Sequence, residues 1–496
     1  MPFTKALAQA GSLDPTFGNM GRAVTTLGND LYDIALQEDG KIVAAGIGNV
    51  LFTEAFGIAR YLNNGLTDTD FGIGGKVSTL IGAKCGASAV ALQADGKIVV
   101  VGYTSDTVGN SGNFDFMIVR YNIDGSLDTS FNLTGIVTIP LPGGDLASVV
   151  QIQSDGKILV GGAKSGDFAL IRLLADGAID PGFNPTGYIG LDASWYGGIT
   201  AMKVLTDDSV IVVGRIRNII NIAKYTSNGV LDETFGNAGQ VVLNAIEGIT
   251  YIPGMVILEN GDFIISGGLY TEQSGKYNGL LVKLSANGSL VESFGANGVL
   301  INDVGTGLSC QARDVAISRN KLVVAYSSGR TSNYDYNVTA YDIDGVPDLT
   351  FGNQGSTIFD FGSQTHDYLH TMLIQPDDKI IVGGNSGTGG FTLARLMPVG
   401  VTAGTDNFTE ARNSFMVYPN PVVQNSKLLV DLKEGGTVTL KLYDVKGALM
   451  ATLAENKTLP AGKTEVPLGI DNLAKGVYFL NITSINGKGT TIRVVK

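Results

Sequence analysis

The only histidines of this 496-residue chain, His366 and His370, lie in one short stretch, GSQTHDYLH. Asp33 and Asp314 begin two short apolar runs elsewhere, DIALQ and DVAIS. A histidine beside two carboxylates suits general acid–base chemistry or metal binding. Asp33, Asp314 and His370 are therefore the low-ranked candidate catalytic residues. His370 is one residue out of register with the aspartates and has no evident orienting partner, so a non-enzymatic role is favoured, and no metal or cofactor is predicted.

The segments that would position these residues belong to an internal repeat, which decides the fold. Each unit contains a relative of NIDGSLDTSF, the stretch that ends at Phe131. Its final residue recurs at spacings of 52 to 60 residues, as Phe17, Phe71, Phe131, Phe183, Phe235, Phe294 and Phe351. A repeat of this length is close to that of a kelch-type propeller blade.

Each unit shows four extended runs, which predict four β-strands. The first is exemplified by GRAVTT (Gly21 to Thr26), the second by AVALQ, the third by KIVVVG, and the fourth ends in a basic-then-apolar pair such as Arg120-Tyr121. An Asp-Gly pair after the second strand suits a two-residue hairpin, because glycine accepts positive φ. Seven such units predict an all-β, seven-bladed β-propeller. The connection lengths predict that GRAVTT completes the last blade, which leaves no open sheet edge.

The signature DG-x-LD-x-(T/S)-FG, with DGKI and the Arg-Tyr pair, resembles the delta-60 repeat family of bacterial propellers over roughly residues 12–397. This resemblance implies the propeller fold and no single activity. The repeated aspartates, such as Asp68 and Asp128, lack the carboxylate spacing and closing glutamate of a calcium loop. Asp and Gly are equally expected in turns. A structural role is therefore predicted for these aspartates, and a packing role for the Arg-Tyr pairs.

The C-terminal part of the chain has a different pattern. Short alternating runs from 413 to 496 predict six or seven strands, which is typical of a small immunoglobulin-like β-sandwich. Four motifs, YPNP, LYDVKG, LAKGVYFLNI and IRVVK, closely resemble the type A C-terminal sorting domain of the type IX secretion system; the alternative is an unrelated immunoglobulin-like module. The motif residues are Tyr418, Pro419, Asn420, Pro421, Asp444, Gly447, Gly476 and Tyr478. The resemblance implies export across the outer membrane, removal of the domain and, often, attachment of the rest to surface lipopolysaccharide.

These patterns predict four parts: residues 1–11 as a leader or a truncated signal-peptide remnant, 12–397 as the propeller, 398–412 as a linker and 413–496 as the sorting domain. Ala8-Gln9-Ala10 has the small-x-small pattern of a signal-peptidase site, but the charged and apolar regions that should precede it are missing. A short disordered leader is the open alternative. The predicted location, secreted or on the outer-membrane surface, therefore rests on the C-terminal motifs.

The composition narrows the choice of partners. With 34 Lys and Arg against 46 Asp and Glu, the net charge of −12 argues against nucleic acid or an anionic membrane as the main partner. No run of 18 apolar residues exists, so no membrane span is predicted. The expected partners are the type IX secretion machinery and a glycan or protein ligand, and a monomer is expected. Cys85 and Cys310 fall in units two and six, and are predicted to be too far apart for a disulfide.

Length variation concentrates in the loops on one face of the predicted propeller, and function tends to lie on such loops. Aromatic residues collect there as well: Tyr32, Trp195, Tyr196, Tyr251 and Tyr368 in loops before the second strand of a unit, and Tyr103 and Tyr334 in loops after the third. Rings with a polar tip suit recognition surfaces. These seven residues are the predicted binding set; the alternative is that they cap the ends of blades.

The resulting prediction is a secreted or cell-surface protein that binds a glycan or a protein and is exported by type IX secretion. Two alternatives stay open: an extracellular polysaccharide-active enzyme that uses the channel mouth, and a structural surface or adhesion component. An enzyme should show paired carboxylates about 5 to 9 Å apart in a pocket. A glycan-binding module should show exposed rings without them.

Overall fold

The computed structural model describes residues 9–107, 114–140, 144–184, 188–191, 197–216, 219–244, 246–272, 274–302, 308–330, 333–362, 366–387, 389–400, 414–418, 426–432, 436–444, 448–460, 462–470, 473–474, 476–484 and 489–496. The chain divides into two compact units, Met1–Ala403 and Gly404–Lys496. Each described hydrophobic cluster lies wholly within one unit, so each unit has a core of its own. Over these ranges, no helix is long and apolar enough to cross a membrane.

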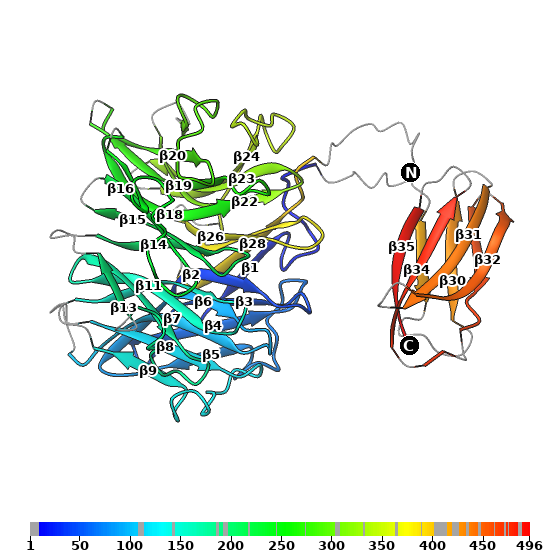
Figure 1. The fold of residues 1–496 in the computed structure, drawn as a ribbon, viewed down its shortest axis with the longest axis horizontal. Coiled ribbons are helices and arrows are strands. Elements are labelled where there is room, and N and C mark those ends of the chain that lie inside the picture. The colour runs from blue at the N-terminus through cyan, green and yellow to red at the C-terminus, as the bar shows by residue number, and fades with distance from the viewer. Residues whose placement is uncertain are drawn as a thin grey trace. The chain divides into compact units, whose positions relative to one another are not determined.

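The first unit is a seven-bladed β-propeller in which each blade is an antiparallel sheet of four strands (Figure 1). From the innermost strand outward, blades 1 to 4 consist of β2 (Gly28–Leu36), β3 (Ile42–Val50), β4 (Thr53–Tyr61) and β5 (Lys76–Thr79); β6 (Lys84–Leu92), β7 (Ile98–Ser105), β8 (Asp115–Tyr121) and β9 (Ile136–Ile139); β10 (Leu146–Ile152), β11 (Ile158–Lys164), β12 (Asp167–Leu173) and β13 (Tyr188–Leu191); and β14 (Gly197–Val204), β15 (Val210–Ile216), β16 (Ile219–Tyr225) and β17 (Gln240–Leu243).

Blades 5 to 7 consist of β18 (Ile249–Ile257), β19 (Phe263–Thr271), β20 (Lys276–Leu284) and β21 (Val299–Asn302); β22 (Ser309–Ser318), β23 (Lys321–Arg330), β24 (Asn333–Asp342) and β25 (Ser356–Phe359); and β26 (Tyr368–Ile374), β27 (Ile380–Asn385), β28 (Phe391–Leu396) and β1 (Arg22–Thr25). The innermost strand of every blade contacts that of the next blade, and β26 contacts β2 in turn. The ring of seven blades is therefore closed, as the repeat predicts.

The two ends of the propeller chain meet in blade 7. The outermost strand of this blade is β1, which pairs antiparallel with β28 from Arg22 opposite Ala394 onward. Just before β1, Leu13 forms a further bridge to Leu396. The predicted closure by GRAVTT is confirmed, and it pairs the edge of blade 7 that would otherwise be open.

Turn chemistry sets the hairpins between the first two strands of each blade. In blades 1 to 3 the turn carries an Asp-Gly pair, and Gly40, Gly96 and Gly156 have φ of 83°, 82° and 83°. Residues with a Cβ atom rarely adopt this backbone conformation, whereas glycine adopts it freely. In blade 4, Asp208 takes the same kind of position with φ of 60°, which Asp tolerates better than most residues. The local sequence therefore fixes these four turns.

The repeat signature forms an inter-blade contact that we call the blade clasp. In blade 2 the buried ring of Phe131 lies under Gly177 of the next unit, where a Cβ would be 2.9 Å from the ring. The guanidinium of Arg120 lies 4.4 Å from the centroid of this ring, and its Nε donates to Asp128 Oδ2 at 2.7 Å. Its Nη1 donates to the carbonyl of Ala175 in the turn of the next unit. The Phe, Arg, Asp and Gly of the signature thus hold neighbouring blades together.

Corresponding basic–acidic pairs occur in other blades: Arg60 with Asp68, Arg172 with Asp180, Lys224 with Asp232 and Arg395 with Asp14. Blade 6 departs from the pattern, because Ala340 stands where the others have Arg or Lys. There Asp348 pairs with Lys321 instead, at 3.5 Å. These contacts give the repeated aspartates and Arg-Tyr pairs structural partners.

The ring of clasps is completed by residues near the start of the chain. Phe351 of blade 6 lies under Gly11, whose φ is 74° and whose added Cβ would be 2.7 Å from the ring. Ala10 is fully buried in the core that blade 6 shares with blade 7. Every other phenylalanine of the repeat packs under a turn glycine of the next unit, and Gly11 takes this place for Phe351. The last two residues of the predicted leader, Ala10 and Gly11, are therefore part of the propeller.

Both cysteines are described and fully buried, and neither forms a disulfide. Cys85 lies in β6 and packs in the cluster that blade 1 shares with blade 2, whereas Cys310 lies in β22 and packs in the cluster between blades 5 and 6. Their separation on the ring agrees with the prediction that they do not form a disulfide with each other.

The second unit consists of two antiparallel sheets. One contains β29 (Ser414–Tyr418), β30 (Lys427–Leu432) and β33 (Gly462–Pro467), and the other contains β32 (Leu449–Leu459), β31 (Gly436–Asp444), β34 (Val477–Ser484) and β35 (Gly489–Val495). Side chains of both sheets share one core, which includes Val430, Leu440 and Leu480. Two sheets that face each other across a shared core form a β-sandwich; its immunoglobulin-like topology stays a prediction.

Candidate functional site

The innermost strand of every blade is interrupted by a register shift at the same place. The shifts fall between Leu31 and Asp33, Ala87 and Ala89, Ala147 and Val149, Ile199 and Ala201, Tyr251 and Gly254, Ala312 and Asp314, and Leu369 and Thr371. A β-bulge of this kind re-aims side chains, because the extra residue is left out of the ladder. Two successive positions of each strand can therefore line the central channel.

A cavity of about 530 Å³, the channel cavity, is lined by residues of the innermost strands around the central channel. Its wall includes residues at the bulge in all seven blades, Tyr32, Ser88, Ser148, Thr200, Pro253, Arg313 and His370, together with Asp33, Asp314, Tyr103, Tyr251 and Lys203. The three candidate catalytic residues thus line one cavity. The register mismatch of His370 does not separate it from the aspartates, since the bulge turns both positions to the channel.

The two channel aspartates are held by backbone donors of adjacent blades. Asp33 Oδ1 accepts from its neighbour Ile34 at 2.8 Å, and its Oδ2 accepts from the N–H of Val90 in blade 2 at 2.9 Å. Thr371 of blade 7 adds a hydroxyl donor to Asp33 at 3.2 Å.

Asp314, in blade 6, makes the same kind of contacts with its own strand and with blade 7. Its Oδ1 accepts from Val315 at 2.8 Å, and its Oδ2 accepts from the N–H of Met372 in blade 7 at 2.9 Å. Each carboxylate therefore ties its own innermost strand to that of the next blade, and each oxygen atom already has a donor.

The environment of the channel shifts the protonation of these groups. Burial raises the pKa of Asp33 to about 6 against the effect of its N–H donors, and the charge of Asp314 adds to the rise. Burial likewise raises the pKa of Asp314 to about 6, although its N–H donors and the charge of Lys203 oppose it. By contrast, burial and the nearby charge of Arg313 lower the pKa of His370 to about 3. His370 is thus neutral at ordinary pH.

Aromatic rings from blades 1, 2, 5 and 7 line the channel cavity. The ring of Tyr32 lies 5.0 Å from that of His370, whose Nε2 is 3.0 Å from Asn385 Oδ1. The hydroxyl of Tyr251 accepts from Arg313 Nη1 at 2.6 Å. Tyr32, Tyr103 and Tyr251 are half-buried, so each ring keeps some accessible surface beside polar groups.

Tyr334 and Tyr368 of the predicted binding set lie outside the channel cavity. Their rings stack at 5.3 Å, and Tyr368 stacks at 5.4 Å on His366. Tyr334 is only 9% exposed, because this ring packs against blade 7. Tyr368 is half-buried. Trp195 and Tyr196 lie outside the described residues.

The predicted placement of the described tyrosines in loops is wrong. Tyr32, Tyr251 and Tyr368 lie in the innermost strands β2, β18 and β26, and Tyr103 and Tyr334 lie in β7 and β24. The strands extend further than the sequence pattern indicates, because pairing resumes after each bulge. The rings are therefore held by sheet rather than by loop backbone.

Two cations of the channel cavity, Arg313 and Lys203, are absent from the predicted set. Arg313 occupies the bulge of β22, and Lys203 lies near the end of β14. A sequence signal for Arg313 exists, since it directly precedes Asp314 as Tyr32 precedes Asp33. No comparable signal marks Lys203.

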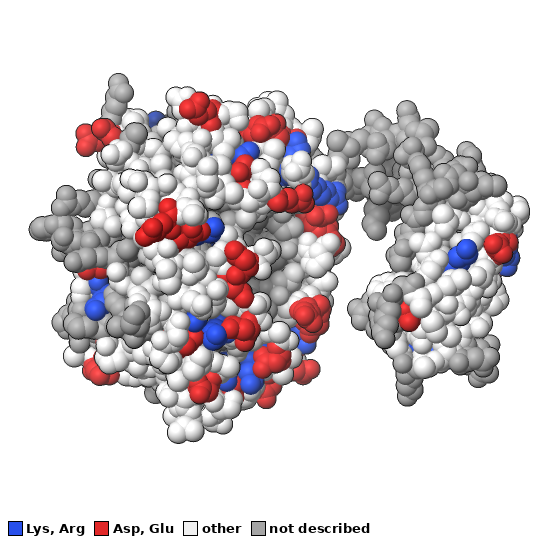
Figure 2. All heavy atoms as spheres, viewed as in Figure 1, with Lys and Arg blue, Asp and Glu red and all other residues white. Residues whose placement is uncertain are grey.

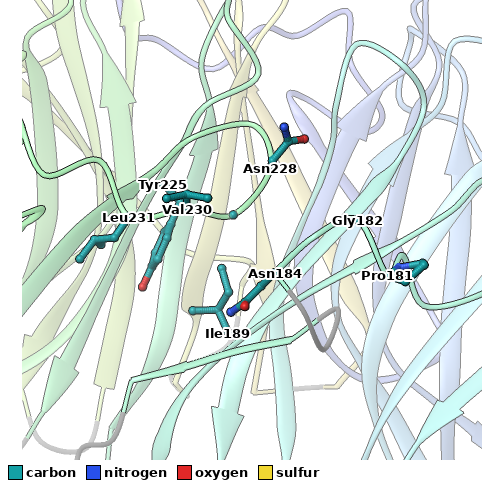
Figure 3. Close-up of a pocket in the computed structure, with 9 residues that line it drawn as sticks. Pro181, Gly182, Asn184, Ile189, Tyr225, Asn228, Val230 and Leu231 are labelled. Carbon is teal, nitrogen blue, oxygen red and sulfur yellow. The ribbon is translucent and has the colours of Figure 1, made fainter.

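A second hollow, of about 600 Å³, lies between the turns that lead out of the third strands of blades 3 and 4 (Figure 3). It is lined by Pro181, Gly182, Asn184, Ile189, Tyr225, Asn228, Gly229, Val230 and Leu231. These described residues include no charged side chain, and the adjoining residues 185–187 are not described. The candidate functional site is therefore the channel cavity.

The distribution of charge gives no sign of a metal site. Figure 2 shows acidic and basic side chains intermingled over the propeller, with the acidic ones in the majority. Within the described ranges, no group of three or more His, Cys, Asp and Glu side chains is placed to hold a metal ion. Hydrogen bonding, charge and aromatic contact are thus the means of recognition that the described cavity wall offers.

The raised pKa values of the channel aspartates predict a contribution to the stability of the propeller that is larger at pH 5 than at pH 7.5. Their folded pKa of about 6 lies above the unfolded value of about 4. Raising the pH from 5 to 7.5 ionises both groups in the folded state, which costs about 1 to 2 kcal/mol for each group. Thermal melts should therefore show that Tm falls less, or rises more, between pH 5 and pH 7.5 in the double variant Asp33→Asn/Asp314→Asn than in the unmodified chain.

Oppositely shifted groups offset part of this effect. The lowered pKa of His370, about 3, costs the folded state about 2 kcal/mol at pH 5, because the unfolded imidazole, with a pKa of about 6.5, is largely protonated there. Burial alone would raise the pKa of Asp14 and Asp128, but hydrogen bonds from Thr16 or Ser130, and the charges of basic partners, lower both to about 2. The stability that they contribute is present above about pH 4 and is lost only below it. An equal change in Tm between pH 5 and pH 7.5 in the unmodified chain and in the double variant would contradict the assignment of the channel aspartates.

Comparison with protein-family models identifies both units. Residues 37–71, 93–131, 153–183 and 375–402 match "Domain of unknown function (DUF5122) beta-propeller", and residues 416–496 match "Secretion system C-terminal sorting domain". The chain carries DUF5122 propeller repeats and a secretion system C-terminal sorting domain. This sorting domain marks proteins that type IX secretion exports to the cell surface or the extracellular space. The predicted fold and location are confirmed, whereas the delta-60 designation stays a prediction.

The DUF5122 propeller is also similar to solved propellers at low identity. A polysaccharide lyase, Uly1, is 12% identical over 80% of this chain and 94% of its own, with a TM-score of 0.45. Drosophila Plexin A in complex with Semaphorin 1b is 9% identical over 78% of this chain and 88% of its own, with a TM-score of 0.41. The propeller domain of the Trilobed protease from Pyrococcus furiosus is 8% identical over 75% of this chain and 94% of its own, with a TM-score of 0.39. No curated protein sequence matches the chain.

Four of the eight predicted motif residues of the sorting domain lie in its described part. Asp444, at the end of β31, accepts a hydrogen bond from the N–H of Ala448 at 2.8 Å, and the buried Tyr478 in β34 donates its hydroxyl to the carbonyl of Ala474 at 2.8 Å. Gly476 pairs with Lys496 through two backbone hydrogen bonds. Tyr418 ends β29. Pro419, Asn420, Pro421 and Gly447 lie outside the described residues.

Proposed function

We propose that this exported DUF5122 propeller is a binding protein that takes up a glycan in the channel cavity. The observation that carries the proposal is the cavity itself: about 530 Å³ of space lined by the rings of Tyr32, Tyr103 and Tyr251 beside hydroxyl, cationic and carboxylate groups. Cavities of roughly 300 to 1,000 Å³ with a few convergent polar groups are typical of small-ligand sites. The propeller is thus a rigid scaffold for one ligand site on its axis.

The chemistry of the wall favours a sugar over a protein partner. A sugar presents an apolar face that packs on an aromatic ring and hydroxyl edges that need donors and acceptors, and a half-buried tyrosine meets both needs. A stable protein interface buries about 800 Å² on each partner and is broad rather than concave. A narrow cavity on the propeller axis therefore fits one or two sugar units better than a protein surface.

The channel carboxylates do not favour the alternative of a glycan-cleaving enzyme. Their raised pKa values resemble those of catalytic acids, but both oxygens of Asp33 and of Asp314 accept hydrogen bonds from the innermost strands. This arrangement explains them as ties between blades 6, 7, 1 and 2. His370, with its low pKa, is a poor general acid or base at neutral pH.

A glycan array followed by calorimetric titration of the best ligand tests the proposal on the full chain. Tyr32→Ala and Tyr103→Ala should each weaken binding about tenfold or more, since aromatic anchors in pockets commonly contribute 2 kcal/mol or so. The matched control is Tyr270→Ala, because Tyr270 is 37% exposed in β19 and pairs with Tyr277 outside the channel cavity. Thermal melts should confirm that all three variants fold.

Two results would overturn the proposal. One is an array on which no glycan binds the folded protein. The other is a ligand whose affinity falls with Tyr270→Ala but not with Tyr32→Ala or Tyr103→Ala, since binding would then lie on the rim and not in the channel.

A further inference from the structure

We propose that the glycan taken up by the channel cavity carries an anionic group, a carboxylate or a sulfate ester, and that Arg313 and Lys203 bind this group. The inference rests on the proposed function and specifies its ligand class. It follows from the cations of the cavity wall and from the hydrogen bonds that its carboxylates already make.

Arg313 has binding capacity that its described neighbours do not use. Its Nη1 donates to the hydroxyl of Tyr251, and its guanidinium lies 4.8 Å from the centroid of that ring, which fixes the side chain in the wall of the cavity. Its Nε is buried, and no described group accepts a hydrogen bond from it. A buried donor without an acceptor is unfavourable. An oxyanion of a ligand, reached by a small rotation of the guanidinium, would relieve this loss.

Lys203 lines the same cavity from blade 4, whereas Arg313 belongs to blade 6. Within the described part of the chain, Lys203 forms no ion pair and no hydrogen bond. Most other basic side chains of the propeller core have a carboxylate partner, as in the blade clasps. Two cations from different blades therefore face one cavity without a carboxylate partner in the described chain.

The carboxylates of the cavity are not free to pair with these cations. Asp33 accepts hydrogen bonds from three donors and Asp314 from two, and these donors belong to the innermost strands. Turning either carboxylate toward Arg313 would break a tie between blades. The cations are thus available to a ligand, and a planar guanidinium is well suited to bind a carboxylate or sulfate through two hydrogen bonds.

Calorimetric titration of the full chain with matched tetrasaccharides tests the inference. The probes are tetragalacturonate, its methyl ester, and a neutral tetrasaccharide with and without sulfate esters. The acidic probe should bind about 10- to 100-fold more tightly than its ester, which is the range expected for one hydrogen bond to a charged group. Arg313→Gln and Lys203→Gln should each remove most of this preference, measured as the ratio of the ester and acid dissociation constants.

The control variant is Lys276→Gln, which removes one positive charge at the start of β20, outside the channel cavity. It should leave the preference for the acid unchanged. Arg313→Lys keeps the charge but loses the planar fork, and should recover only part of the preference. Retained ester binding and an unchanged Tm show that a variant is folded.

The outcomes separate the inference from the proposed function. Equal affinity for acid and ester, with binding lost in Tyr32→Ala, overturns the anionic ligand and leaves the glycan site intact. Tight binding of the sulfated probe alone supports the inference and identifies the group as a sulfate ester. Failure of every probe and of the glycan array overturns both, and an equal loss of acid binding in Lys276→Gln overturns the role of the two channel cations.

Discussion

Deletion of residues 413–496 should abolish delivery of the protein to the cell surface and leave a folded propeller in the periplasm. The deleted part contains the sorting domain, at residues 416–496, and has a core separate from that of the propeller. Because no described core cluster spans the two units, the truncated chain should still melt cooperatively. In a host with type IX secretion, protease treatment of whole cells should degrade the full-length protein and spare the truncated one.

A fusion provides the matched control for this deletion. Residues 404–496, the second compact unit, should export a periplasmic reporter that is otherwise retained; the predicted linker start at 398 is too early, because Val399 is fully buried in the core that blades 6 and 7 share. Protease-accessible truncated protein on whole cells would contradict the sorting role. Periplasmic protein that is degraded or insoluble would instead contradict the independence of the propeller fold.

Replacement of Arg120 by Met should destabilise the propeller by about 2 to 4 kcal/mol, since breaking a buried ion pair leaves a charge poorly compensated. The Arg120 and Asp128 side chains are only 5% and 7% exposed, and Lys97, at 3.2 Å from Asp128, is the remaining cation. The substitution also removes the donor to Ala175 of the next unit and the contact with the ring of Phe131. Urea unfolding of the full chain, followed by tyrosine fluorescence and circular dichroism, measures the loss.

The chain contains a surface pair that serves as the control. Arg319 and Asp378 lie 2.8 Å apart, but their side chains are 43% and 37% exposed. Arg319→Met should therefore change the free energy of unfolding by less than about 1 kcal/mol. Similar losses for Arg120→Met and Arg319→Met would show that the blade clasp adds no more than an ordinary surface pair.

Sequence alone determined the blade count, the closure by residues 21–26 and the packing role of the Arg-Tyr pairs, whereas the ion pair of Arg120 with Asp128 came only from the structure. Each of these three predictions depends on contacts between adjacent units, and these contacts recur at a fixed spacing. Phe131, for example, meets the glycine of the next unit. The sorting domain was also predicted from sequence alone, because its motifs lie within one contiguous stretch of the chain. Local repetition carries such information without any knowledge of the assembled ring.

The tertiary structure decided which residues share the candidate site. Strict alternation along a strand turns one of two neighbouring side chains to the channel, whereas the bulge turns both Arg313 and Asp314 there. The bulges form where seven innermost strands pack around one axis, and no propensity of a single segment specifies this packing. The partner of Asp33 is likewise the N–H of Val90, on the neighbouring blade. Lys203 and Arg313 meet at the cavity only because the ring closes, so their shared role depends on tertiary contacts between distant blades.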